Sequence, residues 1–166
     1  MRHDSRHFRS LCICTLVGAI LLLSPCRSIK AVEAAPSRIE TMELAELNRI
    51  VTRGRGSSLL FFTAAWCGHC KAMLPDLNRL NRRFRDQGLQ FFGLSVDAGG
   101  PDAMQKVVRE NRVDFPVFWV GERAINAYRL VGIPMIFLIK DGHLVEKIPG
   151  KCSYGFLERK ILDLIK

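Results

Sequence analysis

Residues 57–75 read SSLLFFTAAWCGHCKAMLP, and this stretch decides the fold of the chain. It opens on a continuous apolar run, Leu59 to Phe62, of the kind found in central strands that are covered on both faces. Two cysteines separated by two residues, Cys67 and Cys70, follow that run. Apolar residues then recur at helical spacing. The stretch therefore predicts a strand, a C-x-x-C pair at its carboxyl end and a helix.

Strands and helices alternate along the rest of the chain. Upstream of the apolar run, Met42, Leu44 and Leu47 recur at helical spacing, and Thr41 is placed to cap that helix. After the motif, Pro75 removes one hydrogen bond from the next helix and is expected to bend it. The expected elements are helices over 41–53, 71–85, 102–112, 122–130 and 156–165, and strands over 59–62, 89–96, 117–120, 135–139 and 144–148.

The last two strands predict a hairpin, because Asp141-Gly142 separates two apolar runs. Alternating elements that end in a hairpin and a helix indicate an α/β domain with a mixed central sheet and helices on both faces. A chain of 166 residues with 48% apolar composition is expected to bury one such core. We assign residues 57–166 to this domain and residues 35–56 to a spacer and an N-terminal helix.

Residues 1–34 have the layout of a targeting segment. Arg2, Arg6 and Arg9 precede an apolar run over residues 11–23, which is typical of a secretory signal peptide. The small-residue site Val32-Glu33-Ala34 lies well beyond that run, so an uncleaved N-terminal membrane anchor stays as an alternative. The run is shorter than the about 20 residues of a transmembrane helix, which favours the signal peptide. Either interpretation predicts a periplasmic or otherwise extracytoplasmic protein.

The formal net charge of +9 does not indicate a nucleic-acid-binding protein. The densest basic group, Arg79, Arg82, Arg83 and Arg85, falls on a predicted helix and is accompanied by no nucleic-acid-binding motif. We interpret it as a solvated helix face, and we expect a monomer.

The two motif cysteines have the spacing and the context of redox chemistry. A helix N-terminus favours the thiolate, so Cys67 is the predicted nucleophile and Cys70, one turn on, the resolving thiol. A protonated His69 would stabilise the thiolate further and make the disulfide a stronger oxidant. The residues therefore leave the direction of electron flow open.

The motif also admits other interpretations. An inert buried disulfide is one, and a metal site formed by Cys67, His69 and Cys70 is another, although no second cluster supplies a fourth ligand. Covalent haem attachment requires a histidine where Lys71 stands. We expect no cofactor and no metal, and we interpret Cys152 as a buried cysteine without a reactive role.

Trp66-Cys67-Gly68-His69-Cys70-Lys71, together with Pro75 and Gly132-Ile133-Pro134, closely resembles the thioredoxin superfamily, over about residues 57–166. The stretches 94–97, 115–117 and 127–130 resemble the TlpA/ResA-like extracytoplasmic thiol–disulfide oxidoreductases. The resemblance implies a thioredoxin-like fold and a cis peptide bond at Pro134, which would lie beside Cys67. It also implies that Trp66, Ile133 and Pro134 bind substrate, with the Ile133 backbone pairing with an extended chain.

The sequence departs from the family pattern at two positions. Phe61 stands six residues before Cys67, where thioredoxins have a buried acid, and the Gly68-His69 dipeptide resembles protein disulfide isomerases. The resemblance implies a disulfide reductase for exported proteins, supplied by a membrane electron donor and serving cytochrome c or metal-site maturation. A disulfide oxidant or isomerase, with a membrane acceptor, is the first alternative, and a non-catalytic metal-binding or chaperone module the second. Protein thiols and disulfides are the expected partners.

Overall fold

The computed structural model describes residues 38–166. The segment assigned to a signal peptide or membrane anchor, residues 1–34, lies outside the described residues. From residue 38 onward, no helix combines the length and the apolar character that crossing a membrane requires.

The domain is built on one six-stranded sheet, in the order β1-β4-β3-β2-β5-β6. The strands β1 to β4 run parallel, whereas β5 is antiparallel to β2 and β6 is antiparallel to β5. The mixed sheet confirms the predicted fold class. The strands span Glu40–Thr41 (β1), Ser57–Thr63 (β2), Leu89–Ser95 (β3), Val117–Trp119 (β4), Met135–Lys140 (β5) and His143–Pro149 (β6).

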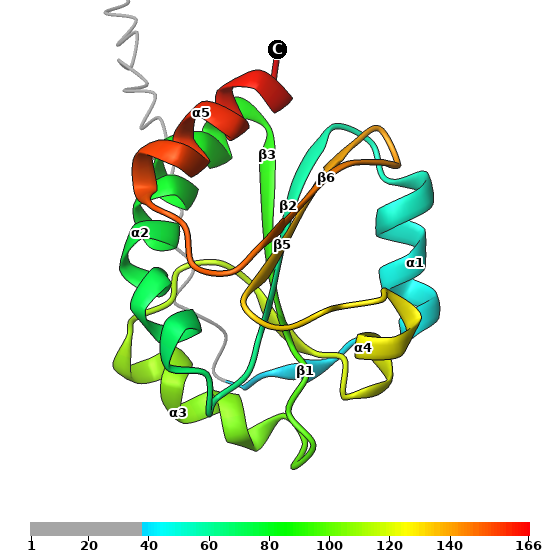
Figure 1. Ribbon diagram of the computed structural model, residues 1–166, viewed down its shortest axis with the longest axis vertical. Coiled ribbons are helices and arrows are strands. Elements are labelled where there is room, and N and C mark those ends of the chain that lie inside the picture. The colour runs from blue at the N-terminus through cyan, green and yellow to red at the C-terminus, as the bar shows by residue number, and fades with distance from the viewer. Residues whose placement is uncertain (1–37) are drawn as a thin grey trace, which may run out of the picture. The chain divides into compact units, whose positions relative to one another are not determined.

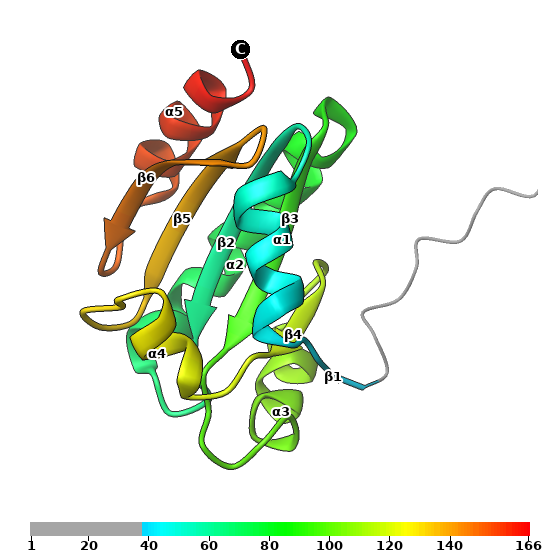
Figure 2. The same ribbon diagram turned by 90° about the vertical axis from the view of Figure 1, so that its right-hand side faces the viewer.

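Helices cover both faces of the sheet. Helices α2, α3 and α5 lie on one side, and α1 and α4 lie on the other (Figures 1 and 2). A short 3₁₀ helix, η1, follows α2 directly. The helices span Leu44–Arg53 (α1), Gly68–Phe84 (α2), Arg85–Gln87 (η1), Asp102–Glu110 (α3), Arg123–Ala127 (α4) and Tyr154–Leu164 (α5).

The start of the domain differs from the sequence-based expectation. Thr41 does not cap a helix, because it lies in β1 and pairs with Trp119 of β4. The neighbouring Ile39 and Met42 are buried, at 2% and 3% exposure, so the sheet edge recruits this segment. Helix α1 therefore begins only at Leu44, and Glu43 occupies the N-cap position.

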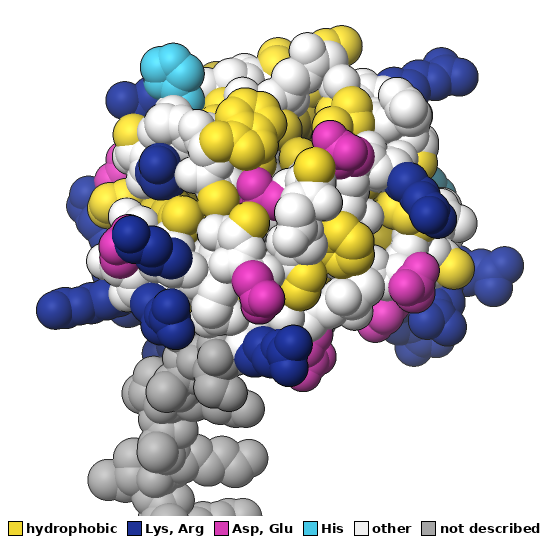
Figure 3. All heavy atoms as spheres, turned by 90° about the horizontal axis from the view of Figure 1, so that it is seen from below, with side chains coloured by type: hydrophobic (Ala, Val, Ile, Leu, Met, Phe, Trp, Pro, Cys, Tyr) yellow, Lys and Arg dark blue, Asp and Glu magenta, His cyan; other side chains and the backbone are white. Residues whose placement is uncertain are grey.

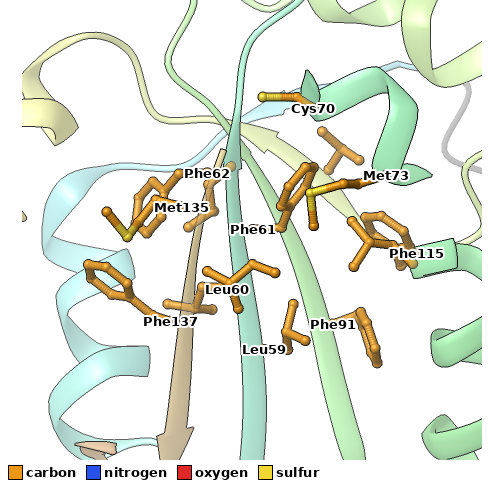
Figure 4. Close-up of a cluster of buried hydrophobic side chains, with 14 of the residues drawn as sticks. Leu59, Leu60, Phe61, Phe62, Cys70, Met73, Phe91, Phe115, Met135 and Phe137 are labelled. Carbon is orange, nitrogen blue, oxygen red and sulfur yellow. The ribbon is translucent and has the colours of Figure 1, made fainter. Parts of the chain in front are cut away.

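The central strand β2 is buried along its whole length, as its apolar sequence predicts. Phe61 points to the side of Cys70 and Met73, whereas Phe62 and Phe137 fill the opposite side (Figure 4). The last two rings meet edge to face, with their centroids 4.9 Å apart, a geometry that aromatic pairs prefer. The C-x-x-C motif thus follows a strand that is buried along its whole length.

Candidate active site

The two motif cysteines lie where β2 passes into α2. Cys67 is the N-cap residue of α2, and its Sγ accepts a hydrogen bond from the backbone amide of Cys70 at 3.1 Å. A disulfide joins Cys67 to Cys70, with the Cα atoms 5.2 Å apart. At this position the amides of the first helical turn, which have no partner within the helix, lie near the Cys67 side chain. They favour negative charge there, which is what a thiolate requires.

The two sulfur-bearing residues differ in access to solvent. Cys67 is 6% exposed and Cys70 is fully buried. Disulfide exchange needs an incoming sulfur to reach the one that it attacks. This difference agrees with the assigned order, in which Cys67 reacts first, but the two roles stay predictions.

The residues beside the cysteines stand in solvent. His69 is exposed, and so is Trp66, at 71% of its surface. Most large apolar residues of the described chain are buried, so an aromatic ring exposed beside the disulfide is unusual for this domain. Its exposure leaves room for the expected binding role of Trp66, which stays a prediction.

The segment before β5 reaches the same edge of the sheet. The Ile133–Pro134 peptide bond is cis. In the register of the sheet Met135 faces Phe62, so Pro134 lies level with the end of β2, from which Cys67 follows. Within residues 38–166, the Ile133 backbone makes no hydrogen bond, whereas the Pro134 carbonyl accepts one from Gly150 at 2.8 Å. The backbone of Ile133 is therefore available to an extended partner chain.

Sequence reasoning missed a buried carboxylate at this edge, that of Asp97. Asp97 is 3% exposed, and each of its carboxylate oxygens accepts the amide hydrogen of Ala65 at 3.0 Å. The Ser95 hydroxyl donates to the same carboxylate at 2.7 Å, and the Trp119 indole N–H donates to the Asp97 carbonyl at 2.7 Å. An available signal was that Asp97 follows β3, the parallel neighbour of β2, because carboxyl ends of parallel strands share one edge.

The position of Phe61 agrees with the departure noted in the sequence. Phe61 is 1% exposed and lies in the core beneath the motif, so β2 contributes no acid there. Within the described part of the chain, Asp97 is the one buried residue with an ionisable carboxylate. The buried charge near this disulfide thus comes from the end of β3.

The arginines of α2 are not a free basic face. Arg82 pairs with Asp114, Arg83 pairs with Glu158, and Arg79 lies 3.4 Å from Asp76. Each pair places a carboxylate beside an arginine, and the three arginine side chains stay 51–60% exposed.

Cys152 is half-buried rather than fully buried as expected, and this burial raises the pKa of its thiol to about 11. Residues 38–166 include no cluster of three or more histidine, cysteine or acidic side chains that could hold a metal.

The fold and the site define a thioredoxin-like protein with a C-x-x-C disulfide at the start of a helix. The sequence profile of the AhpC/TSA family matches residues 27–148. The chain belongs to this family, and the resemblance read from the motifs is confirmed.

Several relatives share part of the chain. Thiol-disulfide oxidoreductase ResA of Bacillus cereus (strain ZK / E33L) is 32% identical over 108 residues, which are 64% of this chain and 61% of the relative. ResA of Geobacillus kaustophilus is 30% identical over 112 residues, which are 66% of this chain and 63% of the relative. The chain thus covers less than two thirds of these relatives.

Solved structures have the same fold. A Chlorobium tepidum protein, assigned by name to the DsbE thiol:disulfide interchange proteins, is 27% identical with a TM-score of 0.62. The match covers 67% of this chain and 81% of that one. StoA of Bacillus subtilis, at 18% identity and a TM-score of 0.57, covers 66% of this chain and 84% of its own, and it supports the fold alone.

Proposed function

We propose that this protein is a thiol–disulfide oxidoreductase that exchanges disulfides with exported proteins through Cys67 and Cys70. The observation that carries the proposal is the placement of the disulfide, with Cys67 at the N-cap of α2 and 6% exposed while Cys70 is fully buried. A purely structural disulfide needs neither a helix N-terminus nor access for a partner. The relatives named thiol-disulfide oxidoreductase ResA support the same activity.

In the reducing direction, the Cys67 thiolate attacks one sulfur of a substrate disulfide. A mixed disulfide forms, and the other substrate sulfur leaves as a thiolate and takes up a proton. Cys70 then loses its proton and attacks the Cys67 sulfur, so the Cys67–Cys70 disulfide forms and the second substrate sulfur leaves as a thiolate that takes up a proton. Two electrons pass from the protein dithiol to the substrate. The Cys70 amide, 3.1 Å from Cys67 Sγ, would hydrogen-bond the thiolate more strongly than the neutral thiol.

The surface around Cys67 suits an unfolded or extended polypeptide. The large apolar residues Trp66 and Val131 are 71% and 88% exposed. Figure 3 shows the end of the domain at which β2 and β3 finish. Hydrophobic side chains gather near the middle of this surface, and most lysine and arginine side chains lie nearer its margin. Ile133 and Pro134 would supply backbone contacts there, and Trp66 would supply an apolar one.

We further propose that the protein works as a reductase, that a membrane donor supplies its electrons, and that cytochrome c or metal-site maturation is the process served. Its extracytoplasmic location rests on the pattern of residues 1–34. One observation favours an oxidant or isomerase instead: His69 is exposed between the two cysteines, where its protonated form would stabilise a thiolate. The reduction potential separates the two, since known oxidants and isomerases lie near about −120 to −180 mV and thioredoxin near about −270 mV.

Trapping of partners tests the proposal. In Cys70→Ser the resolving thiol is absent, so mixed disulfides at Cys67 should accumulate with exported proteins and be released by reductant. Cys67→Ser, which keeps Cys70, is the matched control and should trap nothing. Equal trapping by both variants would contradict the assigned order of the cysteines. No trapping and no insulin reduction would favour a non-catalytic metal-binding or chaperone module.

A further inference from the structure

The end of β3 carries a charge that the exchange steps above do not use. Asp97 follows β3, and its carboxylate reaches across to the segment between β2 and Cys67 (Ala64 to Trp66). In chain order, 32 residues separate Asp97 from Ala65, its hydrogen-bond partner. This contact joins the ends of two neighbouring strands at the edge that holds the disulfide.

We propose that Asp97 is a positioning residue for Cys67, and that its buried negative charge lowers the reduction potential of the Cys67–Cys70 couple. The proposal rests on the proposed function and deepens it, because it names the group that biases the site toward reduction of its substrates. It also supplies from β3 the buried acid that Phe61 excludes from β2.

The positioning follows from the hydrogen bonds. Both carboxylate oxygens accept from the Ala65 amide at 3.0 Å, and the Ser95 hydroxyl donates at 2.7 Å. These contacts suit an ionised carboxylate, which accepts at both oxygens. Ala65 precedes Cys67 by two residues, so the bond fixes the chain just before it reaches the helix N-terminus.

The electrostatic effect follows from burial and proximity. Two peptide units separate Ala65 from Cys67, which puts the carboxylate within about 12 Å of the Cys67 Cα. Asp97 is 3% exposed and Cys67 is 6% exposed, so salt and water screen their interaction only weakly. A nearby negative charge disfavours a thiolate and raises the thiol pKa. The reduced protein loses stability relative to the disulfide, and the potential of the couple falls.

Asp97→Asn separates charge from position. The asparagine Oδ1 can accept from the Ala65 amide, and its Nδ2 can donate to the Ser95 hydroxyl, so both contacts persist without the charge. Asp97→Ala removes charge and contacts together. Asp163→Asn is the matched control, because it removes one carboxylate from the solvent-facing side of α5, where the Asp163 side chain is 69% exposed.

The test is equilibration of each purified protein with glutathione, in which two glutathione thiols reduce the Cys67–Cys70 disulfide and become one glutathione disulfide. Asp97→Asn should shift this equilibrium toward the protein dithiol by threefold to tenfold, a rise in potential of about 14–30 mV. Asp163→Asn should shift it by less than 1.5-fold. An Asp97→Asn protein that folds and has the wild-type potential would overturn the proposal and leave Asp97 a structural contact.

A second measurement needs no variant. The carboxyl carbon of Asp97 is followed by NMR against pH in oxidised and in reduced wild-type protein. Because coupling between two sites is reciprocal, reduced protein should show a second step at the pH where the Cys67 thiolate forms, and oxidised protein should lack it. Identical curves would refute the coupling, whether or not Asp97→Asn folds. Insulin reduction is measured in parallel. A protein that shows the coupling but does not reduce insulin would contradict the proposed function and leave the coupling of Asp97 to Cys67 intact.

Discussion

Reduction of the disulfide should destabilise the domain if the protein is a reductase. The folded and the unfolded chain can each be oxidised or reduced, which gives a closed cycle of four states. The unfolding free energy of the oxidised protein minus that of the reduced protein therefore equals the free energy of disulfide reduction in the folded chain minus that in the unfolded chain. A couple that is more reducing when folded therefore belongs to a protein that is more stable oxidised. The perturbation is simple: the same protein is unfolded with and without a reductant.

Two terms set the expected magnitude. The disulfide closes a ring with a sequence separation of 3, and the loop-entropy relation gives about 2 kcal/mol of stabilisation for so short a ring. Reduction frees a thiolate at the N-terminus of α2, and the helix dipole returns about 0.3–1 kcal/mol to the reduced form. The oxidised protein should thus be more stable by about 1–2 kcal/mol, or about 4 °C in Tm for each kcal/mol.

Urea unfolding followed by circular dichroism measures this difference. The same experiment on Cys152→Ser is the control, because it removes the third cysteine of the domain without touching the disulfide. A reduced form that is more stable than the oxidised form by 1 kcal/mol or more would refute the reasoning. That result would identify the protein as an oxidant, in which the reduced state is stabilised.

Three further outcomes are expected. Cys67→Ser should abolish insulin reduction in a turbidity assay, whereas Cys152→Ser should retain at least half of it; loss of turnover in both would mean that the third cysteine takes part. Cys152 should react slowly with a thiol reagent at pH 8 in folded protein and rapidly in urea. The reason is that burial raises the pKa of its thiol to about 11, and the neutral thiol is unreactive. Rapid labelling without urea would contradict the burial. Met73→Ala should lower the unfolding free energy by about 2–5 kcal/mol, because Met73 is 2% exposed beneath the motif and its removal leaves a cavity. A loss below 1 kcal/mol would show that the core collapses into this cavity.

Local patterns were sufficient to predict much of the fold. The apolar run of β2, the helical spacing after Cys70 and the Asp141-Gly142 turn each depend on residues close in sequence, and each element appears within about three residues of its expected bounds. Helix α4 is the shortest relative to its expectation. It ends at Ala127, shortly before Arg129, whose φ of 51° does not continue a helix.

Features that depend on long-range pairing could not be predicted. Thr41 has the chemistry of a helix cap, but it pairs with Trp119, which lies far along the chain. The arginines of α2 are exposed, as a solvated face predicts, but the pairing of Arg83 with Glu158 of α5 could not be predicted from the sequence. Asp97 was missed although it follows a predicted strand, because its role depends on which strand ends lie side by side.

The central claim is that Cys67 is the reacting group of a thiol–disulfide oxidoreductase, and labelling of the reduced protein tests it most directly. Reduced protein is treated briefly with iodoacetamide at neutral pH, and the labelled peptides are mapped by mass spectrometry. We predict that Cys67 carries the label at least tenfold faster than Cys70 or Cys152, and that the labelled protein no longer reduces insulin. Equal labelling of Cys67 and Cys70, or full insulin reduction after Cys67 is blocked, would contradict the account.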